Sequence, residues 1–183
     1  MVYLKNEKYF PKDASSILSL CRSTLQEANI IIRDVRVASQ FLELDISIKT
    51  LSDKNKISSI LSKIAPVLEI DRIVEKEFDK KEAVALARQL FNNEKYWKTH
   101  EVLEAVWKNT VGSERDLLNG IILIAAALVH YQKEELAICI SVMKRALVKL
   151  DKSYDKYYDI DMESLKRKVT DMVNSNTVSN IKI

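Results

Sequence analysis

The stretch of sequence that decides the fold reads Tyr96-Trp97-Lys98-Thr99-His100-Glu101-Val102-Leu103-Glu104-Ala105-Val106-Trp107. This spacing of apolar residues predicts a helix. At 3.6 residues per turn, one side of that helix carries Tyr96, His100, Leu103, Glu104 and Trp107. A histidine and a carboxylate therefore share a stripe that is otherwise aromatic and apolar.

The next segment predicts a second, more apolar helix. A loop at Gly112 leads into the run Ser113–Gly120, and the apolar residues that follow continue to His130. Helical spacing groups three polar side chains in one sector of this helix, namely Arg115, Asn119 and His130. Most of its remaining surface is Leu, Ile, Ala and Val. We therefore expect a helical hairpin whose second helix is buried on several sides.

The polar side chains of this hairpin need partners, because an unpaired polar group in a buried place costs roughly 1–3 kcal/mol. We expect Glu104 or Glu101 to face Arg115, and His100 to approach His130. A buried ion-pair network of this kind would fix the register between the two helices.

Composition restricts the class of protein. Of the 183 residues, 47% are hydrophobic, and the net charge is only +3 although 30% of the residues are charged. Because opposite charges are interspersed, no basic block indicates nucleic-acid binding. The apolar run at 121–129 is far shorter than the roughly 20 residues of a membrane span, and the N-terminus lacks a signal-peptide core. We expect a cytoplasmic protein that does not enter a membrane.

Cysteine and glycine usage disfavours the common cofactor sites. Cys21 and Cys139 stand alone on predicted helices without a CxxC pair, so we expect buried free thiols. The chain has only two glycines, which leaves no glycine-rich loop to hold a phosphate group. We therefore expect no cofactor and no structural metal.

The first 75 residues have the pattern of an α+β domain. The expected elements are a strand at 2–4, a helix opened by Pro11 and Asp13, strands at 29–36 and 40–49, a helix capped by Ser52 or Asp53 and stopped by Pro66, and a strand at 67–73. The order β-α-β-β-α-β is the ferredoxin-like pattern, in which two helices cover one face of a four-stranded antiparallel sheet.

Residues 76–183 form the second predicted domain. A charged junction at 75–81 marks the boundary, and helical periodicity then predicts a multi-helical bundle of about five antiparallel helices. In its long apolar helix, Gly120 and Ala127 share a face narrow enough for another helix to approach closely. We expect the tyrosines at 154, 157 and 158 in a polar connection, and the Ser/Asn-rich tail from Asn174 to fray.

The segment 91–150 resembles the domain of unknown function 309 family, small all-helical proteins of bacteria and archaea. The residues that carry the resemblance are Phe91-Asn92, Tyr96, His100-Glu101-Val102-Leu103-Glu104, Trp107, Arg115, Gly120 and His130. The resemblance implies a prokaryotic protein with a multi-helical array, whose polar residues line a central cleft. It implies no reaction.

The chain departs from the family pattern at two positions. Asn119 stands where the family usually has a glutamine, and Leu123 replaces a second glutamine one turn later. The resemblance therefore implies a smaller polar cleft in this chain. It does not include the N-terminal half, so the protein is similar to a fusion of that helical domain with an α+β module.

Two enzymatic hypotheses use the same polar residues. His100, Glu104 and His130 offer two nitrogens and a carboxylate to a catalytic zinc or iron ion, although Glu104 stands where a His-Glu-x-x-His motif requires its second histidine. Alternatively, Glu104 and His100 act as an acid–base pair of a hydrolase. Three aromatic residues of the first helix would line the pocket, namely Tyr96, Trp97 and Trp107.

The function that we favour from sequence is binding or scaffolding. The α+β half would recognise a partner protein or a small-molecule ligand, and the helical half, with its buried network of His, Glu and Arg side chains, would be a rigid platform. Assembly into a homo-oligomer through an uncovered face of the sheet stays open.

Overall fold

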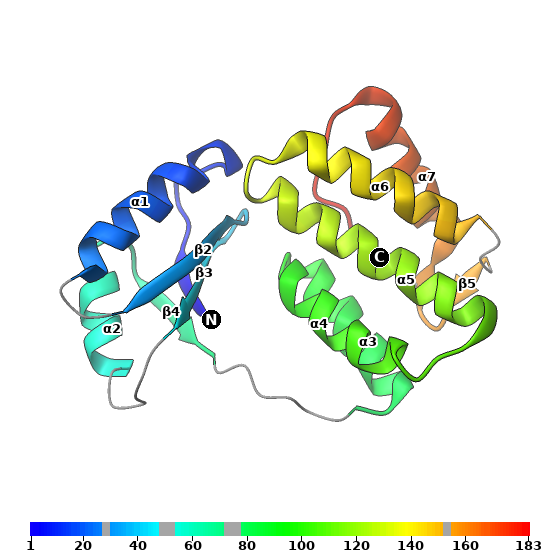
Figure 1. Cartoon of the computed structure of the whole chain (residues 1–183), viewed down its shortest axis with the longest axis horizontal. Helices are drawn as coiled ribbons and strands as arrows, with labels where there is room; N and C mark the ends of the chain where they lie inside the picture. The colour runs from blue at the N-terminus through cyan, green and yellow to red at the C-terminus, as the bar shows by residue number, and fades with distance from the viewer. Residues whose placement is uncertain (27–29, 48–53, 72–77, 152–154) are drawn as a thin grey trace. The chain divides into compact units, whose positions relative to one another are not determined.

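The computed structural model describes residues 1–26, 30–47, 54–71, 78–151 and 155–183. The chain divides into two compact units. The first comprises Met1–Glu75 and Gln132–Glu134, and the second comprises Lys76–Tyr131 and Glu135–Ile183. The first unit contains a four-stranded antiparallel sheet with helices, and the second is mostly helical (Figure 1). The predicted mixed architecture, a sheet followed by several helices, is confirmed.

The first unit alternates strands and helices. Its elements are β1 (Val2–Lys5), the 3-10 helix η1 (Pro11–Asp13), α1 (Ala14–Leu25), β2 (Ile31–Val37), β3 (Phe41–Ser47), α2 (Lys54–Leu61) and β4 (Val67–Ile70). The strands lie in the order β2-β3-β1-β4, and each pair of neighbours is antiparallel. The predicted caps at Ser52 and Asp53, the predicted strand ends at 29, 48–49 and 72–73, and the predicted domain boundary at 75/76 lie outside the described residues.

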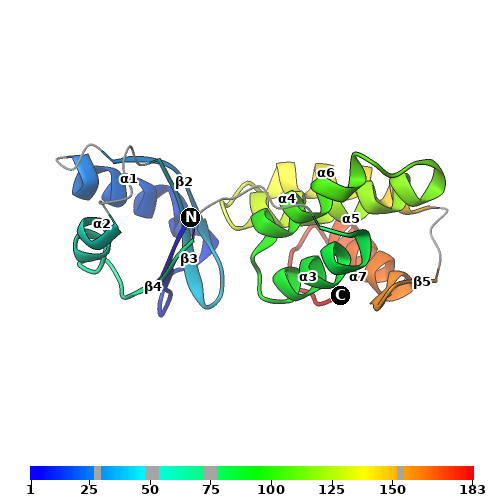
Figure 2. The same ribbon diagram turned by 90° about the horizontal axis from the view of Figure 1, so that it is seen from below.

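One face of this sheet carries the core of the first unit. Strand side chains alternate, so Val2 and Leu4 of β1 lie on the same face as Leu42 and Leu44 of β3. Helices α1 and α2 lie together on one side of the sheet (Figure 2). They cover that face with buried apolar residues, which are Ala14, Ile17, Cys21, Leu25, Ile57 and Leu61.

A row of polar side chains crosses the other face of the sheet. Arg36 of β2 is the register partner of Glu43 on β3, and Glu43 is the partner of Tyr3 on β1. Each of the three is only 2% exposed, and Arg36 Nη1 donates a hydrogen bond of 2.5 Å to Glu43 Oε1. A buried arginine is stable there because a carboxylate balances its charge.

The second unit is built from helices and one small hairpin. Its elements are α3 (Lys80–Asn92), α4 (Tyr96–Trp107), α5 (Gly112–Tyr131), α6 (Leu136–Leu150), β5 (Lys156–Tyr157), β6 (Ile160–Asp161) and α7 (Met162–Ser175). The β5–β6 hairpin replaces the polar connection expected for Tyr157 and Tyr158. Tyr157 is 7% exposed, and its hydroxyl donates to Glu114 Oε1 at 2.9 Å, so it belongs to the core. Tyr154 lies outside the described residues.

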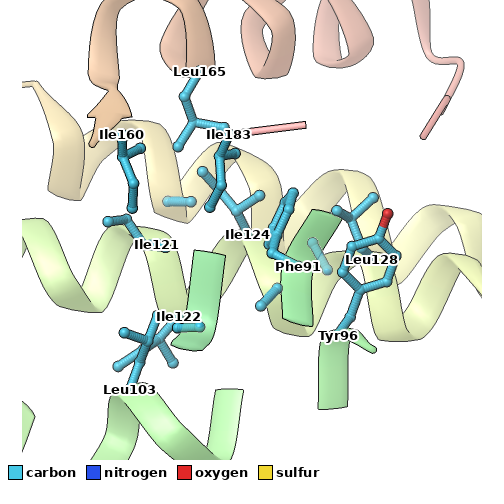
Figure 3. Packing of buried hydrophobic residues seen from close by; sticks show 14 of the residues in the cluster. Phe91, Tyr96, Leu103, Ile121, Ile122, Ile124, Leu128, Ile160, Leu165 and Ile183 are labelled. Carbon is cyan, nitrogen blue, oxygen red and sulfur yellow. The ribbon is translucent and has the colours of Figure 1, made fainter. Parts of the chain in front are cut away.

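Helix α5 lies at the centre of the core. Its buried residues occupy most of the helix circumference, and they are Leu117, Leu118, Gly120, Ile121, Ile122, Ile124, Ala125, Ala127, Leu128 and Val129. Figure 3 shows apolar side chains from several other elements, including Leu103 of α4 and Leu165 of α7, directed into the same core. The expectation that this helix is buried on several sides is confirmed.

The tail corrects one expectation. We expected the residues after Asn174 to fray, but α7 continues to Ser175, and Ile181 and Ile183 are then 8% and 9% exposed. The main chain of Ile183 is hydrogen-bonded to Asn92 and to Arg88 of α3. The serine and asparagine residues suggested disorder, but two isoleucines at alternate positions bring the tail back onto the core.

Gly120 lets α5 and α6 approach each other closely. A Cβ atom added to Gly120 would lie 2.4 Å from Leu150 Cδ2 and 2.5 Å from Leu150 Cγ. Leu150 is fully buried, so its side chain has no free space into which it could move. The predicted reason for this glycine, close approach of a neighbouring helix, agrees with this geometry.

We predict that Gly120→Ala lowers the free energy of unfolding by about 1–2 kcal/mol, because overpacking outweighs the gain in helix propensity. Urea denaturation followed by circular dichroism measures this change. The matched control is the same substitution in a Leu150→Ala background, where the added methyl group has room and the loss should largely disappear. An equal loss in both backgrounds would contradict the role assigned to Leu150.

Candidate functional site

The candidate site begins at the turn between α3 and α4. Glu94 adopts a left-handed conformation with φ 59°, and its N–H donates to the carbonyl of Phe91 at 2.9 Å. The Lys95 carbonyl then accepts hydrogen bonds from the N–H and the hydroxyl of Thr99 at 3.0 Å. These bonds start α4 at Tyr96, so the stripe of Tyr96, His100 and Glu104 lies one helical turn apart at each step.

Tyr96 is a fully buried polar side chain. Its exposed fraction is 0%, and its ring packs edge-on against Phe91 with 5.0 Å between ring centroids (Figure 3). Burial raises the pKa of the Tyr96 hydroxyl well above its usual range, so the group is neutral. Among the described residues its oxygen has no hydrogen-bond partner. The hydroxyl is therefore an unsatisfied polar group within an apolar core.

His100 lies one turn further along α4, is half-buried, and also has one buried atom without a partner among the described residues. Its ring stacks on Trp97 with centroids 5.7 Å apart and an interplanar angle of 14°. The Nδ1 atom is buried and finds no hydrogen-bond partner within the described part of the chain. Burial lowers the pKa of the imidazole, and the carboxylate of Glu104 opposes this effect without reversing it. His100 is therefore neutral near pH 7.

Two glutamates of α4, Glu101 and Glu104, follow His100 closely in the sequence. Glu104 is half-buried and close enough to His100 to act on its charge. Glu101 is also half-buried. The structure thus joins Tyr96, His100 and Glu104 along one face of α4, with two unsatisfied atoms and one carboxylate.

Arg115 does not pair with either glutamate as we expected. It is exposed, its guanidinium lies 4.5 Å from the centroid of the Trp107 ring, and its Nη1 donates to the Thr110 carbonyl at 3.4 Å. Trp107 Nε1 in turn donates to the Arg115 carbonyl at 3.1 Å. The cation–π contact and these bonds fasten the turn between α4 and α5, which gives Trp107 and Arg115 a structural role.

His130 also has a partner that sequence reasoning missed. Its Nδ1 is hydrogen-bonded to Glu135 Oε2, and the Glu135 N–H donates to the His130 carbonyl at 2.9 Å. Between them, Glu134 takes a left-handed φ of 65°, which closes the turn from α5 to α6. A left-handed residue was not predictable from a glutamate, so the pairing was not visible from helical spacing. Asn119 is half-buried within α5.

The candidate residues therefore fall into three sets of contacts. Tyr96, Trp97, His100 and Glu104 lie along α4, Trp107 and Arg115 fasten one turn, and His130 with Glu135 fastens another. Within the described ranges, no three or more His, Cys, Asp or Glu side chains come together in a way that could hold a metal ion. His100, Glu104 and His130 thus do not form the ligand set that a zinc or iron site requires.

No helix in the part of the chain that the structure describes is long and apolar enough to cross a membrane. The apolar run of α5 is instead covered by the neighbouring helices.

We predict that the His100 ring titrates below the ordinary histidine value of about 6.5. Because the unfolded chain takes up this proton more readily, the contribution of neutral His100 to stability is complete above that pH and decreases as the pH falls towards the folded-state pKa. NMR titration of the ring protons measures the midpoint, and since the chain has two histidines, His130→Gln assigns the signal. A midpoint above 6.5 would show that Glu104 outweighs burial.

Comparison with known proteins identifies one similarity. A family model described as "Domain of unknown function (DUF309)" matches residues 84–142, a range that holds every candidate residue from Tyr96 to Glu135. No curated protein matches the chain. The match does not include residues 1–75. The resemblance drawn from Phe91, His100 and Trp107 is confirmed within this range, and the helical unit is similar to the DUF309 family there.

Proposed function

We propose that this protein is a binding protein, and that its helical unit binds a small neutral ligand along the Tyr96–His100 side of α4. The observation that carries this proposal is the pair of buried polar atoms, Tyr96 Oη and His100 Nδ1, one turn apart and without partners among the described residues. Buried polar groups are nearly always hydrogen-bonded, so two on one helical face require an explanation.

The energetics favour a functional reason for these atoms. Each unsatisfied buried group costs about 1–3 kcal/mol, whereas phenylalanine at position 96 would fill nearly the same volume without that cost. Packing alone therefore does not explain a tyrosine beside Phe91. Sites that bind ligands are commonly less stable than the same fold could be, because their polar groups find their partners in the bound state.

The charges around the site indicate the class of ligand. Tyr96 and His100 are both neutral near pH 7, and the Glu104 carboxylate would repel an anion. A hydroxyl or carboxamide group can both donate and accept a hydrogen bond, so it could satisfy both atoms. Trp97, stacked on His100, provides an aromatic side to the same region. We therefore propose a neutral ligand with an amide or a hydroxyl group.

For the N-terminal unit we propose a ferredoxin-like domain, with its boundary at residue 75, that recognises a partner protein or supports the helical unit. The strand order β2-β3-β1-β4 with antiparallel neighbours supports this topology.

A cytoplasmic location belongs to the same proposal, and the free thiols of Cys21 and Cys139 are consistent with a reducing compartment.

Acid–base hydrolysis is the second candidate. A neutral imidazole next to a carboxylate can act as a general base, and His100 with Glu104 has this combination. Hydrolysis of p-nitrophenyl acetate tests it. A rate above background that is lost in His100→Gln and kept in His130→Gln would favour an enzyme over a binding protein.

We predict that Tyr96→Phe raises the free energy of unfolding of the ligand-free protein by about 1 kcal/mol, because it removes an unsatisfied hydroxyl. Urea denaturation measures the change, and Tyr157→Phe is the matched control. The Tyr157 hydroxyl is bonded to Glu114, so its loss should destabilise the protein. A destabilised Tyr96→Phe variant would mean that the Tyr96 hydroxyl is already satisfied, and the binding proposal would fail.

We further predict that benzamide shifts the NMR signals of the His100 ring, whereas benzoate of nearly the same shape does not. The amide can donate and accept a hydrogen bond, and the carboxylate would meet the charge of Glu104. The shift should disappear in Tyr96→Phe. Equal shifts with both compounds would contradict the proposed preference for a neutral ligand.

A further inference from the structure

The tail of the second unit is held in an extended form. Residues 177–183 have no regular secondary structure, and in the last three residues the burial alternates, with Ile181 and Ile183 buried and Lys182 exposed. This alternation is the pattern of an extended chain that lies with one side on a surface.

Side chains of two helices bind the main chain of this tail. The carboxamide of Asn92 donates to the Ile183 carbonyl at 3.0 Å and accepts from the Ile183 N–H at 2.8 Å. Arg88 Nε donates to the same carbonyl at 2.9 Å, and Lys168 Nζ donates to the Lys182 carbonyl at 2.9 Å. These bonds recognise an extended backbone, and they do not depend on which chain supplies it.

The apolar contacts of the tail, like its hydrogen bonds, would be the same for a tail supplied by another chain. The Ile183 side chain belongs to the same buried cluster as Ile124 of α5 and Leu165 of α7 (Figure 3). Complete burial of an isoleucine side chain contributes about 1.5–3 kcal/mol, so exposure of this surface is unfavourable. We call Arg88, Asn92, Lys168, Ile124 and Leu165 the tail-binding surface.

The connection between α7 and the tail is a short exposed segment. The helix ends at Ser175, Asn176 reverses the chain with φ 52°, and residues 174–177 are all exposed. A change of backbone angles within these four residues would redirect the tail without disturbing any buried side chain. Such a connection is the hinge that exchange of a segment between identical chains requires.

We propose that the tail-binding surface takes the segment Val178–Ile183 of a second copy of this chain, and that two copies exchange their tails reciprocally. The occupant is identified by the contacts themselves, because an identical segment reproduces every hydrogen bond and both buried isoleucines. Exchange then changes only the backbone angles of the hinge and costs the entropy of bringing two chains together. The exchanged fraction therefore increases with protein concentration. This inference is independent of the ligand proposed for Tyr96 and His100.

Two full-length variants test the exchange by complementation. Arg88→Ala with Asn92→Ala weakens the surface and leaves a normal tail, and Ile181→Ser with Ile183→Ser weakens the tail and leaves a normal surface. We expect each variant alone to be monomeric by light scattering and the mixture to form a one-to-one complex. When Asn92 is restored in the first variant, so that only Arg88→Ala remains, its tail binds its own surface again. We then expect a smaller amount of the mixed complex. A mixture of folded variants that stays monomeric at ~1 mM, the effective concentration of a short tether, overturns the proposal.

A second measurement keeps the test valid if either double variant fails to fold. Lys182 is exposed, so Lys182→Cys can carry a donor or an acceptor dye in an otherwise unchanged chain. We expect energy transfer between the two labelled populations to grow with concentration. It should fall at least tenfold when a peptide with the sequence Val178–Ile183 is added at ~10 mM, about ten times the effective concentration of the tether, because the peptide then occupies the tail-binding surface of both populations. Energy transfer that is absent, or that is unchanged by the peptide, rejects tail exchange.

Discussion

The close approach of α6 to α5 at Gly120 is the constraint on which the helical unit depends. With Leu150 against the glycine backbone, α5 is buried on most sides, whereas Asn119, Leu123 and Ala126 form a half-buried strip along it. Polar side chains near the two ends of α5 have partners. Arg115 in the first turn contacts Trp107, and His130 in the last turn contacts Glu135.

Part of the candidate site could be predicted from the sequence. Helical spacing correctly indicated that Tyr96, His100 and Glu104 share a face of α4, because periodicity determines direction around a helix axis. It could not tell which neighbour each side chain meets. Arg115 found an indole ring and a carbonyl at a nearby turn, and both lie closer in sequence than the glutamates to which it was assigned.

The fold was predictable to a similar extent. Alternation in Phe41–Ser47 and the stripe of Ala14–Leu25 were strong local signals, and both elements are present. The tail and the β5–β6 hairpin were missed because their residues are polar on average. Their positions depend on single buried side chains, Ile183 and Tyr157, whose contacts are remote in sequence. The average composition of a segment does not show that one of its side chains is buried.

Among the described residues of the helical unit, the buried side-chain atoms without a hydrogen-bond partner belong to Tyr96 and His100 of α4. Other polar side chains of the unit do have close partners, as in the set of Lys80, Glu114 and Tyr157, where one carboxylate accepts from both other side chains. Tyr96 and His100 are therefore not explained by a generally loose or poorly packed protein. Their two unpaired atoms lie on one face of α4. A binding site leaves polar groups without partners in the protein, whereas a structural polar network pairs them with one another.

The location of the tryptophans has a practical consequence for spectroscopy. The chain contains two, Trp97 and Trp107, and both belong to α4. Tryptophan fluorescence therefore reports on the helical unit and not on the four-stranded sheet. Far-ultraviolet circular dichroism has contributions from both units. A difference between the two transitions during denaturation would reveal whether the halves of this chain melt as one cooperative body or in separate steps.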